Sequence, residues 1–336
     1  MDIDLILDAR ASADELAELG VLAEELGFSG IWVSSLLDGR DPFANMSVLA
    51  RATRRIAMGP IAVNPWDMHP VRISGGLHTL NELSKGRARI VIGGGGEALA
   101  SLGLKPARRV RAVQECVEII RTASLGKRFD YAGKLYQASG YGLGWLESAA
   151  PQVFVAANME QMLRMSGRVA DGVMLSDLPA NLAQQAIATA RSAAADAGRN
   201  PAKLWFSSFT AWHVYPDEQR ARNEAKRWLL LRGLFRPWVL QEFLEQPDID
   251  LIMNNQAAFV NAFAAGSHVI EGIPDRLADT LVDHLTLTAT PERLARLIDE
   301  LARYKAAGLT SVSLRLYEQP AETMQLVAAK VLPSLA

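Results

Sequence analysis

Short apolar runs rich in β-branched residues recur along the chain, separated by longer segments with the apolar spacing of amphipathic helices. Strands are predicted at residues 3–7, 30–34, 56–63, 87–93, 153–156, 172–175, 204–214 and 310–316. Helices are predicted at residues 13–26, 42–54, 69–83, 106–123, 159–168, 181–197 and 291–307. Eight strands in alternation with helices indicate a (β/α)8 TIM barrel. A doubly wound open sheet is the alternative, but it seldom reaches this many strands in strict alternation.

Two segments depart from this alternation. Residues 127–137 are interpreted as a hairpin, and residues 217–288 are long and helical, with aromatic residues at roughly helical spacing. We interpret the second segment as a helical layer packed on the barrel or as a subunit interface, in preference to an aromatic cofactor site. No Gly/Ser linker or charge block marks a boundary, so residues 1–336 are expected to form one domain with a helical insertion at about 217–288.

The fourth predicted strand ends in four consecutive glycines, Gly93 to Gly96, followed directly by Glu97. Residues without a Cβ allow positive φ and let a flat or phosphorylated ligand approach the backbone. The motif is not a dinucleotide fingerprint, which needs spaced glycines at the first strand–helix turn, and no Gly-Lys-Ser/Thr follows as in a Walker loop. A ligand site is therefore predicted at this loop, with a flexible turn as the alternative.

Composition narrows the class of protein. The chain has 336 residues, of which 49% are hydrophobic and 21% charged, and its formal net charge is −2. This balance argues against nucleic acid as a partner, and the apolar stretches are too short to span a membrane. The acidic N-terminus is unlike a signal peptide, so the cytoplasm is the expected location. The single cysteine, Cys116, has the spacing of a buried core thiol and excludes an internal disulfide.

The C-terminal ends of barrel strands carry the site in this fold. Here they deliver Asp8, Ser34, Ser35, Val63, Asn64, Pro65, the glycines with Glu97, Ala156, Ala157, Asn158, Ser176, Asp177, Trp212 and His213. This set contains no Lys or Arg and one His, and it offers neither a metal triad nor a visible Ser-His-Asp set. Small residues, backbone donors and apolar walls are suited to a planar cofactor that carries its own chemistry.

The motifs GFSGIWVSS, GPIAVNPWDMHP, GRARIVIGGGGE, PQVFVAAN and SGRVADGVMLSD, in this order, resemble the bacterial-luciferase-like flavin and deazaflavin enzymes. The chain is most similar to their F420-dependent methylenetetrahydromethanopterin reductase branch. The resemblance runs from Ile3 to Leu316 and implies a barrel that forms a homodimer or larger homo-oligomer. It also implies a cis peptide between Ile61 and Ala62.

The resemblance further implies the site residues. An acid follows the glycine loop, here Glu97, and an acid of the first strand matches Asp4; both are assigned catalytic roles. Residues that border the cofactor are Ser34, Ile61, Ala62, Val63, Asn64, Gly93, Gly94, Gly95, Gly96, Ala156, Ala157, Asn158 and Met159. One departure is clear: many members carry Asp-His after the second strand, where this chain has Ser35-Leu36. That difference weighs against a mechanism using this histidine and against a sugar-phosphate dehydrogenase.

The predicted activity is hydride transfer between coenzyme F420 and a small organic substrate. A reduced-FMN monooxygenase of the same fold is the first alternative, and a flavin-binding barrel without turnover is the second. Glu97 is preferred to His69 as the acid/base group, because His69 precedes Pro70 at a predicted helix start and is interpreted as a cap. F420 is preferred to FMN as the cofactor, and no metal is expected.

Overall fold

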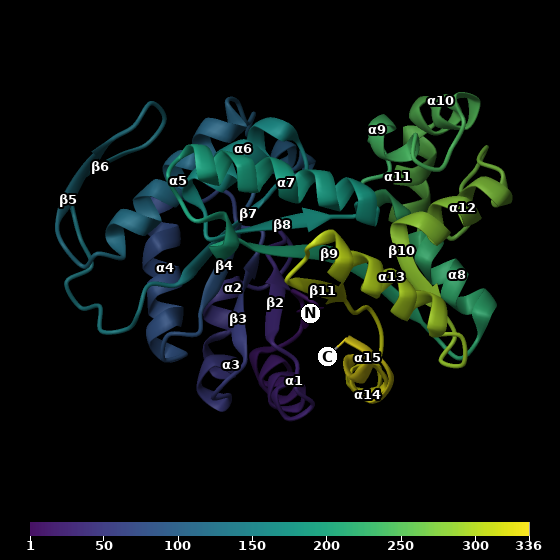
Figure 1. Ribbon diagram of the computed structural model, residues 1–336, viewed down its shortest axis with the longest axis horizontal. Helices are drawn as coiled ribbons and strands as arrows, with labels where there is room; N and C mark the ends of the chain where they lie inside the picture. Colours follow the sequence, from purple (N-terminus) through teal and green to yellow (C-terminus); the bar gives the residue numbers. More distant parts are fainter. Residues whose placement is uncertain (336) are drawn as a thin grey trace.

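The eight predicted strands form one parallel barrel in the computed structural model, which describes residues 1–335 apart from the side chains of residues 97 and 98 (Figure 1). The barrel strands are β1 (Asp2–Leu7), β2 (Gly30–Ser34), β3 (Ala57–Ile61), β4 (Arg89–Ile92), β7 (Gln152–Ala156), β8 (Gly172–Ser176), β9 (Trp205–Val214) and β11 (Ser311–Arg315). They follow the order β3-β2-β1-β11-β9-β8-β7-β4. Bridges between Met58 and Ala88 and between Val63 and Ile92 join β3 to β4, so the barrel closes as predicted.

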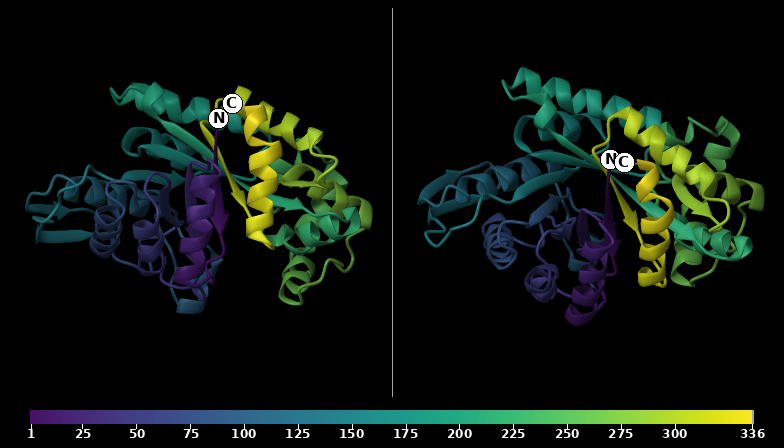
Figure 2. Two further views of the ribbon diagram at one scale, coloured as in Figure 1. Left: turned by 90° about the horizontal axis from the view of Figure 1, so that it is seen from below. Right: turned by 60° about the horizontal axis from the view of Figure 1, so that its bottom comes forward.

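Helices surround the strands, and the predicted alternation is confirmed with small shifts at the ends. The surrounding helices are α1 (Ala13–Glu25), α2 (Pro42–Asn45), α3 (Ser47–Ala52), α4 (Pro70–Leu83), α5 (Arg109–Ala123), α6 (Glu160–Val169), α7 (Ala180–Asp196), α13 (Ala295–Ala307), α14 (Pro320–Lys330) and α15 (Leu332–Leu335). The helix predicted over residues 42–54 is divided at Met46. Both chain ends lie together, and the Met1 amino group donates to the Leu335 carbonyl oxygen at 3.1 Å (Figure 2).

A hairpin projects from the barrel between β4 and β7. It consists of β5 (Phe129–Ala132) and β6 (Gln137–Tyr141), and it extends beyond the predicted range (Figure 1). The buried carboxylate of Glu115 on α5 accepts the backbone N–H groups of Lys134, Leu135 and Tyr136, which fixes the turn. A short 3-10 helix, η1 (Glu97–Leu102), precedes α5, although helical structure was predicted only from residue 106.

The insertion after β9 is helical for most of its predicted length. It contains α8 (Glu218–Arg227), η3 (Leu229–Leu231), α9 (Pro237–Leu240), α10 (Gln246–Asn254), α11 (Gln256–Ala264) and α12 (Asp275–Leu285), and another short turn, η2 (Pro201–Lys203), precedes β9. Its aromatic rings pack on one another, as Trp228 does on Phe263 at 5.6 Å between ring centroids. The prediction is wrong at its end, because β10 (Thr286–Ala289) pairs with the C-terminal half of β9.

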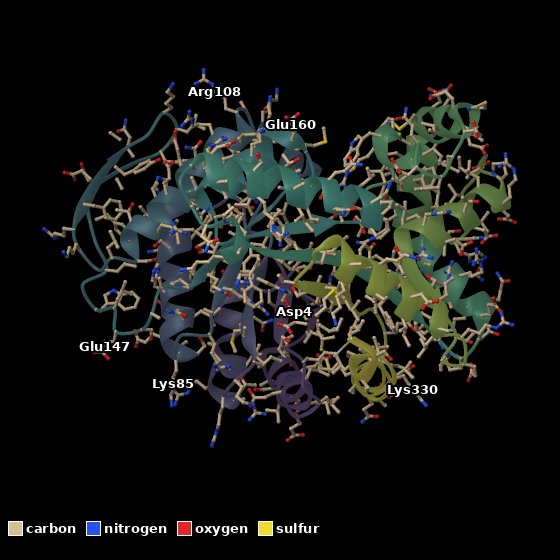
Figure 3. The ribbon with its side chains drawn as sticks, in the orientation of Figure 1. Asp4, Lys85, Arg108, Glu147, Glu160 and Lys330 are labelled. Carbon is tan, nitrogen blue, oxygen red and sulfur yellow. The ribbon has the colours of Figure 1, made fainter. Side chains whose placement is uncertain are left out.

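Asp4 lies inside the barrel, in the N-terminal half of β1, and not at the strand ends (Figure 3). Its fully buried carboxylate accepts from Arg89 Nη2 at 2.9 Å and from Trp32 Nε1 at 3.0 Å. Gly30 and Gly59 make room for Arg89, since a Cβ on either would lie 1.4 Å and 1.7 Å from its atoms. The charge of Asp4 is thus neutralised in a structural ion pair, and the catalytic role predicted for this residue stays a prediction.

No helix in the described part of the chain is long and apolar enough to cross a membrane. Cys116 is fully buried in α5, as predicted, and burial raises the pKa of its thiol.

Candidate functional site

Two neighbouring cavities open at the C-terminal ends of the strands. The first, the glycine cavity, has a volume of about 340 Å³ and is lined by Ser35, Leu36, Leu37, Ala62, Asn64, Asp67, Gly93, Gly94, Gly95, Gly96 and Leu99. The second, the α6 cavity, has about 620 Å³ and is lined by Val110, Ala156, Ala157, Asn158, Met159, Glu160, Gln161, Met162, Met174, Ser176 and Arg236. A Cβ on Gly94 would lie 3.5 Å from Met162, so the two cavities are adjacent.

Because they have no side chains, the glycines keep the glycine cavity open and let neighbouring backbone segments lie close together. A Cβ on Gly93 would lie 3.1 Å from the Cβ of Ala62, a closer approach than nearly all side chains make. Gly95 has a φ of 77°, which favours glycine, and a Cβ there would meet Leu99 at 2.5 Å. The Ile61–Ala62 peptide bond beside them is cis, as predicted. The backbone itself thus forms much of the surface that a ligand would meet.

Two asparagines hold the loops around the cavities in place. The Oδ1 of Asn64 accepts from the backbone N–H of Trp66 and Asp67, which forms an Asx turn after β3. The Asn158 amide donates to the Ser176 carbonyl oxygen at 2.8 Å and accepts from the Ser176 N–H at 3.1 Å. Their side chains are therefore occupied in positioning the loops, and the loops present backbone groups to the cavities.

Helix α6 points its N-terminus at the α6 cavity. Its cap residue, Met159, makes no side-chain capping hydrogen bond, so the first backbone N–H groups have no side-chain acceptor at the cap. Such a helix start attracts anions through its dipole and its free N–H groups. The start of α6 is therefore suited to a ligand phosphate.

Several predicted residues do not line either cavity. Ile61 and Val63 are buried in the hydrophobic core, and Ser34 is the last residue of β2, one position before the cavity residue Ser35. The side chain of Glu97 lies outside the described part of the structure, so its role stays a prediction. His69 is the N-cap of α4, where Nδ1 accepts from the Val71 N–H, and its interpretation as a cap is confirmed.

The structure corrects the prediction that the strand ends lack cations. Arg315 is the last residue of β11 and therefore lies at a strand end. The predicted strand continued past this residue, so Arg315 was not counted among the strand-end residues. Arg232 and Arg236 reach the strand ends from the insertion, where no strand-end signal marks them. Arg232 forms an ion pair with Asp177 at 3.2 Å, and Arg236 donates to the Ser176 carbonyl oxygen at 3.1 Å.

His213, on β9, is fully buried beside these arginines. Its ring stacks on Tyr317 with 4.4 Å between centroids. Burial, together with the positive charges of Arg232 and Arg315, lowers the pKa of His213 to about 3. The imidazole is consequently neutral at physiological pH and adds no charge to this side of the mouth.

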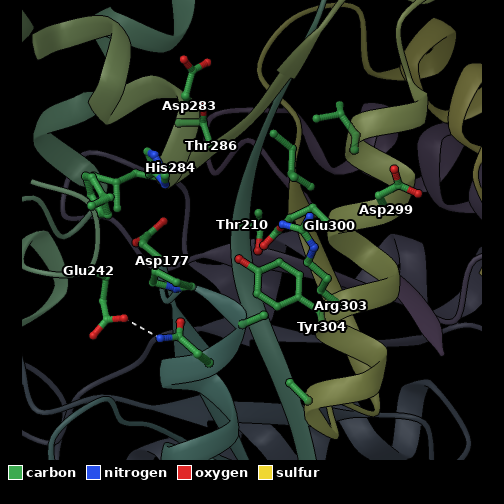
Figure 4. A pocket seen from close by; sticks show the side chains of 18 of the residues that line it. Asp177, Thr210, Glu242, Asp283, His284, Thr286, Asp299, Glu300, Arg303 and Tyr304 are labelled. Atoms are coloured by element: carbon green, nitrogen blue, oxygen red, sulfur yellow. Dashed lines mark hydrogen bonds and ion pairs between the residues drawn. The ribbon is translucent and has the colours of Figure 1, made fainter.

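A larger groove of about 760 Å³ lies on the outer wall, between the barrel and the insertion (Figure 4). Helices α7, α12 and α13 and strand β10 supply its lining, and Asp177 and Thr210 lie among the lining residues. It shares none of its lining residues with the two cavities at the mouth. This groove was not predicted from sequence.

The two cavities suit a flavin or deazaflavin. Small residues and a close backbone leave space for a planar ring, apolar Met162 and Met174 shield it, and the α6 start can accept a phosphate. Among the residues that the structure describes, no group of three or more His, Cys, Asp or Glu side chains is arranged to hold a metal ion.

Comparisons with known proteins agree with this fold. The 5,10-methylenetetrahydromethanopterin reductase of Archaeoglobus fulgidus is 26% identical over 321 residues, covering 94% of this chain and 93% of that protein. The structure of coenzyme F420-dependent tetrahydromethanopterin reductase from Methanopyrus kandleri aligns over 100% of this chain and 99% of its own, with a TM-score of 0.79 and 20% identity. An F420-dependent secondary alcohol dehydrogenase in complex with an F420–acetone adduct aligns over 100% and 99%, with a TM-score of 0.80 and 17% identity.

A family model described as luciferase-like monooxygenase matches residues 2–311, nearly the whole chain. The match agrees with the family that the strand-end motifs resembled. The chain therefore belongs to the luciferase-like monooxygenase family.

Proposed function

We propose that this protein transfers a hydride between coenzyme F420 and a small organic substrate. The observation that carries the proposal is the pair of adjacent cavities at the strand ends, lined by the glycine loop on one side and the start of α6 on the other. Supporting it is the reductase of Archaeoglobus fulgidus, which is similar over almost the entire chain.

The residues of the chain position and shield the reactants. The four glycines admit the face of a planar ring, and the backbone N–H groups at the start of α6 hold a phosphate. Met162 and Met174 exclude water from the inner wall. Coenzyme F420, when bound, supplies the site that gives or accepts the hydride. We propose Glu97 as the group that holds or moves the accompanying proton.

A reduced-FMN monooxygenase is the second candidate, favoured by the description of the matching family model. The glycine loop and the α6 start serve a ribityl phosphate in either cofactor, so the cavities do not separate the two. A flavin-binding barrel without turnover is the third, since Ser35-Leu36 replaces the Asp-His of many F420 members.

Anaerobic oxidation of reduced F420, followed by absorbance with a panel of neutral and anionic carbonyl compounds, tests the proposal. Enzyme-dependent oxidation by at least one acceptor is expected. Oxygen-dependent turnover of reduced FMN without any F420 oxidation would support the second candidate instead. Tight cofactor binding with no turnover of either kind would favour the third.

We further propose that the protein works in the cytoplasm as a homodimer or larger homo-oligomer and that the whole chain is one domain. The single, buried cysteine is compatible with a reducing compartment. Light scattering on the purified chain measures the oligomeric state directly.

A further inference from the structure

Three arginines gather at one side of the barrel mouth; we name Arg232, Arg236 and Arg315 the arginine cluster. Arg232 is 3% exposed, Arg315 is 8% exposed and Arg236 is half-buried. In the strand order, the β9 and β11 side of the barrel lies opposite β3 and β4, which carry the glycine cavity. The mouth therefore has a glycine half and an arginine half, and Arg236, which also lines the α6 cavity, lies at the border between the cluster and that cavity.

The charges of the arginine cluster are not balanced. Asp177 forms an ion pair with Arg232 at 3.2 Å. Within the described part of the chain, neither Arg236 nor Arg315 forms an ion pair; their hydrogen bonds go to the Ser176 carbonyl oxygen at 3.1 Å and the Ile6 carbonyl oxygen at 3.4 Å.

The field of the Asp8 carboxylate reaches Arg315, but the Asp8 side chain is 45% exposed and is paired with Arg10. Burial, together with the charge of Arg232, lowers the pKa of both Arg236 and Arg315. Arg236 and Arg315 thus form no ion pair of their own in the described part of the chain, although the field of Asp177 reaches Arg236.

Polar atoms without partners surround the same place. Among the described residues, both ring nitrogens of His213 and the hydroxyl of Tyr317 are buried and make no hydrogen bond. The Arg315 guanidinium lies 5.3 Å from the Tyr317 ring centroid. Buried cations that repel one another and donors that lack acceptors are costly, unless an anion completes the site.

We propose that the substrate carries an anionic group, a carboxylate or a phosphate, and that Arg236 and Arg315 bind it. The inference rests on the proposed function, because it assigns the arginine half of the mouth to the substrate and the glycine half to the cofactor ring. The planar, permanently charged guanidinium suits both anions, which it binds through parallel hydrogen bonds. The anionic group would be held on one side of the mouth while the reacting carbon faces the glycine half.

Calorimetric titration of the cofactor-free protein with inorganic phosphate and with acetate, at constant ionic strength in chloride, tests the proposal. At least one anion binds the wild type, and Arg315→Gln and Arg236→Gln each weaken that binding at least tenfold. Arg293→Gln, which removes an exposed arginine from a surface pair with Glu218, leaves it unchanged. If Arg315→Gln does not fold, Arg315→Lys takes its place; it keeps the charge but loses the parallel N–H groups, and it is also expected to weaken anion binding.

The Arg315→Gln variant is then titrated with F420, whose affinity is expected to change less than twofold. Arg236 lines the α6 cavity proposed for the cofactor phosphate, so its variant is not used for this comparison. Equal anion binding by wild type and both cluster variants, meaning an adventitious ion only, overturns the proposal, as does no anion binding at all. A tenfold loss of F420 affinity in Arg315→Gln also overturns it, because Arg315 would then bind the phosphate of the cofactor. If the wild type binds anions but neither F420 nor FMN, the proposed function fails while the anion site stands.

Discussion

Asp4 and Arg89 form an ion pair deep inside the barrel, so removing one partner leaves an uncompensated buried charge. Asp4→Ala is expected to lower the free energy of unfolding by about 3–5 kcal/mol in urea denaturation. Asp38→Ala, which breaks an exposed pair with Arg10, is the control and should cost less than about 1 kcal/mol. An Asp4 variant as stable as the wild type but without turnover would contradict this structural role and support the catalytic role predicted for Asp4.

Glu97 is the acid/base group in this account. Glu97→Gln is expected to lower kcat by about 10²–10⁴ in the F420 assay, because the amide cannot exchange the proton. His69→Asn should leave kcat close to that of the wild type, since asparagine also caps a helix. Full activity of the Glu97 variant alongside an inactive His69 variant would reverse the two roles.

His213 makes stability depend on pH in a defined direction. Its pKa is about 3 in the folded protein and about 6.5 in the unfolded chain, so between these values the unfolded chain binds the extra proton. The contribution of His213 to the free energy of unfolding is complete above about pH 6.5. It decreases as the pH falls, by up to about 1.4 kcal/mol per pH unit. Urea denaturation between pH 7 and about 4.5 should show a shallower dependence in His213→Phe. Parallel curves for the two proteins would contradict the assignment.

At the scale of elements, the glycine loop should matter for the ligand more than for folding. Gly94 lines the glycine cavity, and a Cβ there would make only ordinary contacts, 3.4 Å from Arg109 and 3.5 Å from Met162. Gly94→Leu is therefore expected to fold and to weaken cofactor binding at least tenfold in a fluorescence titration. The control is Gly75→Ala in α4, where a Cβ meets nothing within 4 Å. This change should leave cofactor affinity intact and raise stability by about 0.4–1 kcal/mol. Unchanged affinity in the Gly94 variant would place the cofactor elsewhere.

Sequence reasoning predicted the elements whose ends carry their own local signals. The apolar run before Gly93 identified β4, and the Pro and Gly positions bounded most of the helices. Strand β10 was missed because Thr286 to Ala289 follows α12 without a turn and is a strand only through its pairing with β9. Non-local pairing of this kind has no signature in a short window.

The residues of the candidate site were also predicted only in part. The loops lining both cavities were predicted, because in this fold the residues that follow each strand lie at the mouth of the barrel. The arginines were not, since Arg232 and Arg236 reach the mouth from an insertion of irregular topology. The ion pair of Asp4 was not predicted, because strand position alone does not show that Arg89 lies opposite it in the barrel.

At the scale of the whole molecule, the proposed sites for the cofactor and for the substrate lie on different sides of the barrel mouth. The glycine loop and the α6 start lie at the ends of β4 and β7, and the arginine cluster lies toward β8, β9 and β11. The insertion contributes two of the three arginines, so it forms part of the mouth as well as a covering layer. A change in the insertion is therefore expected to alter the choice of substrate more than the choice of cofactor.

The measurement that tests the central claim most directly is an equilibrium titration of cofactor-free protein with F420 and with FMN under the same conditions, followed by fluorescence. Hydride transfer with F420 requires a site for it, so we expect F420 to bind at micromolar concentration and FMN to bind more weakly. Binding of FMN at micromolar concentration without detectable binding of F420 would contradict the claim.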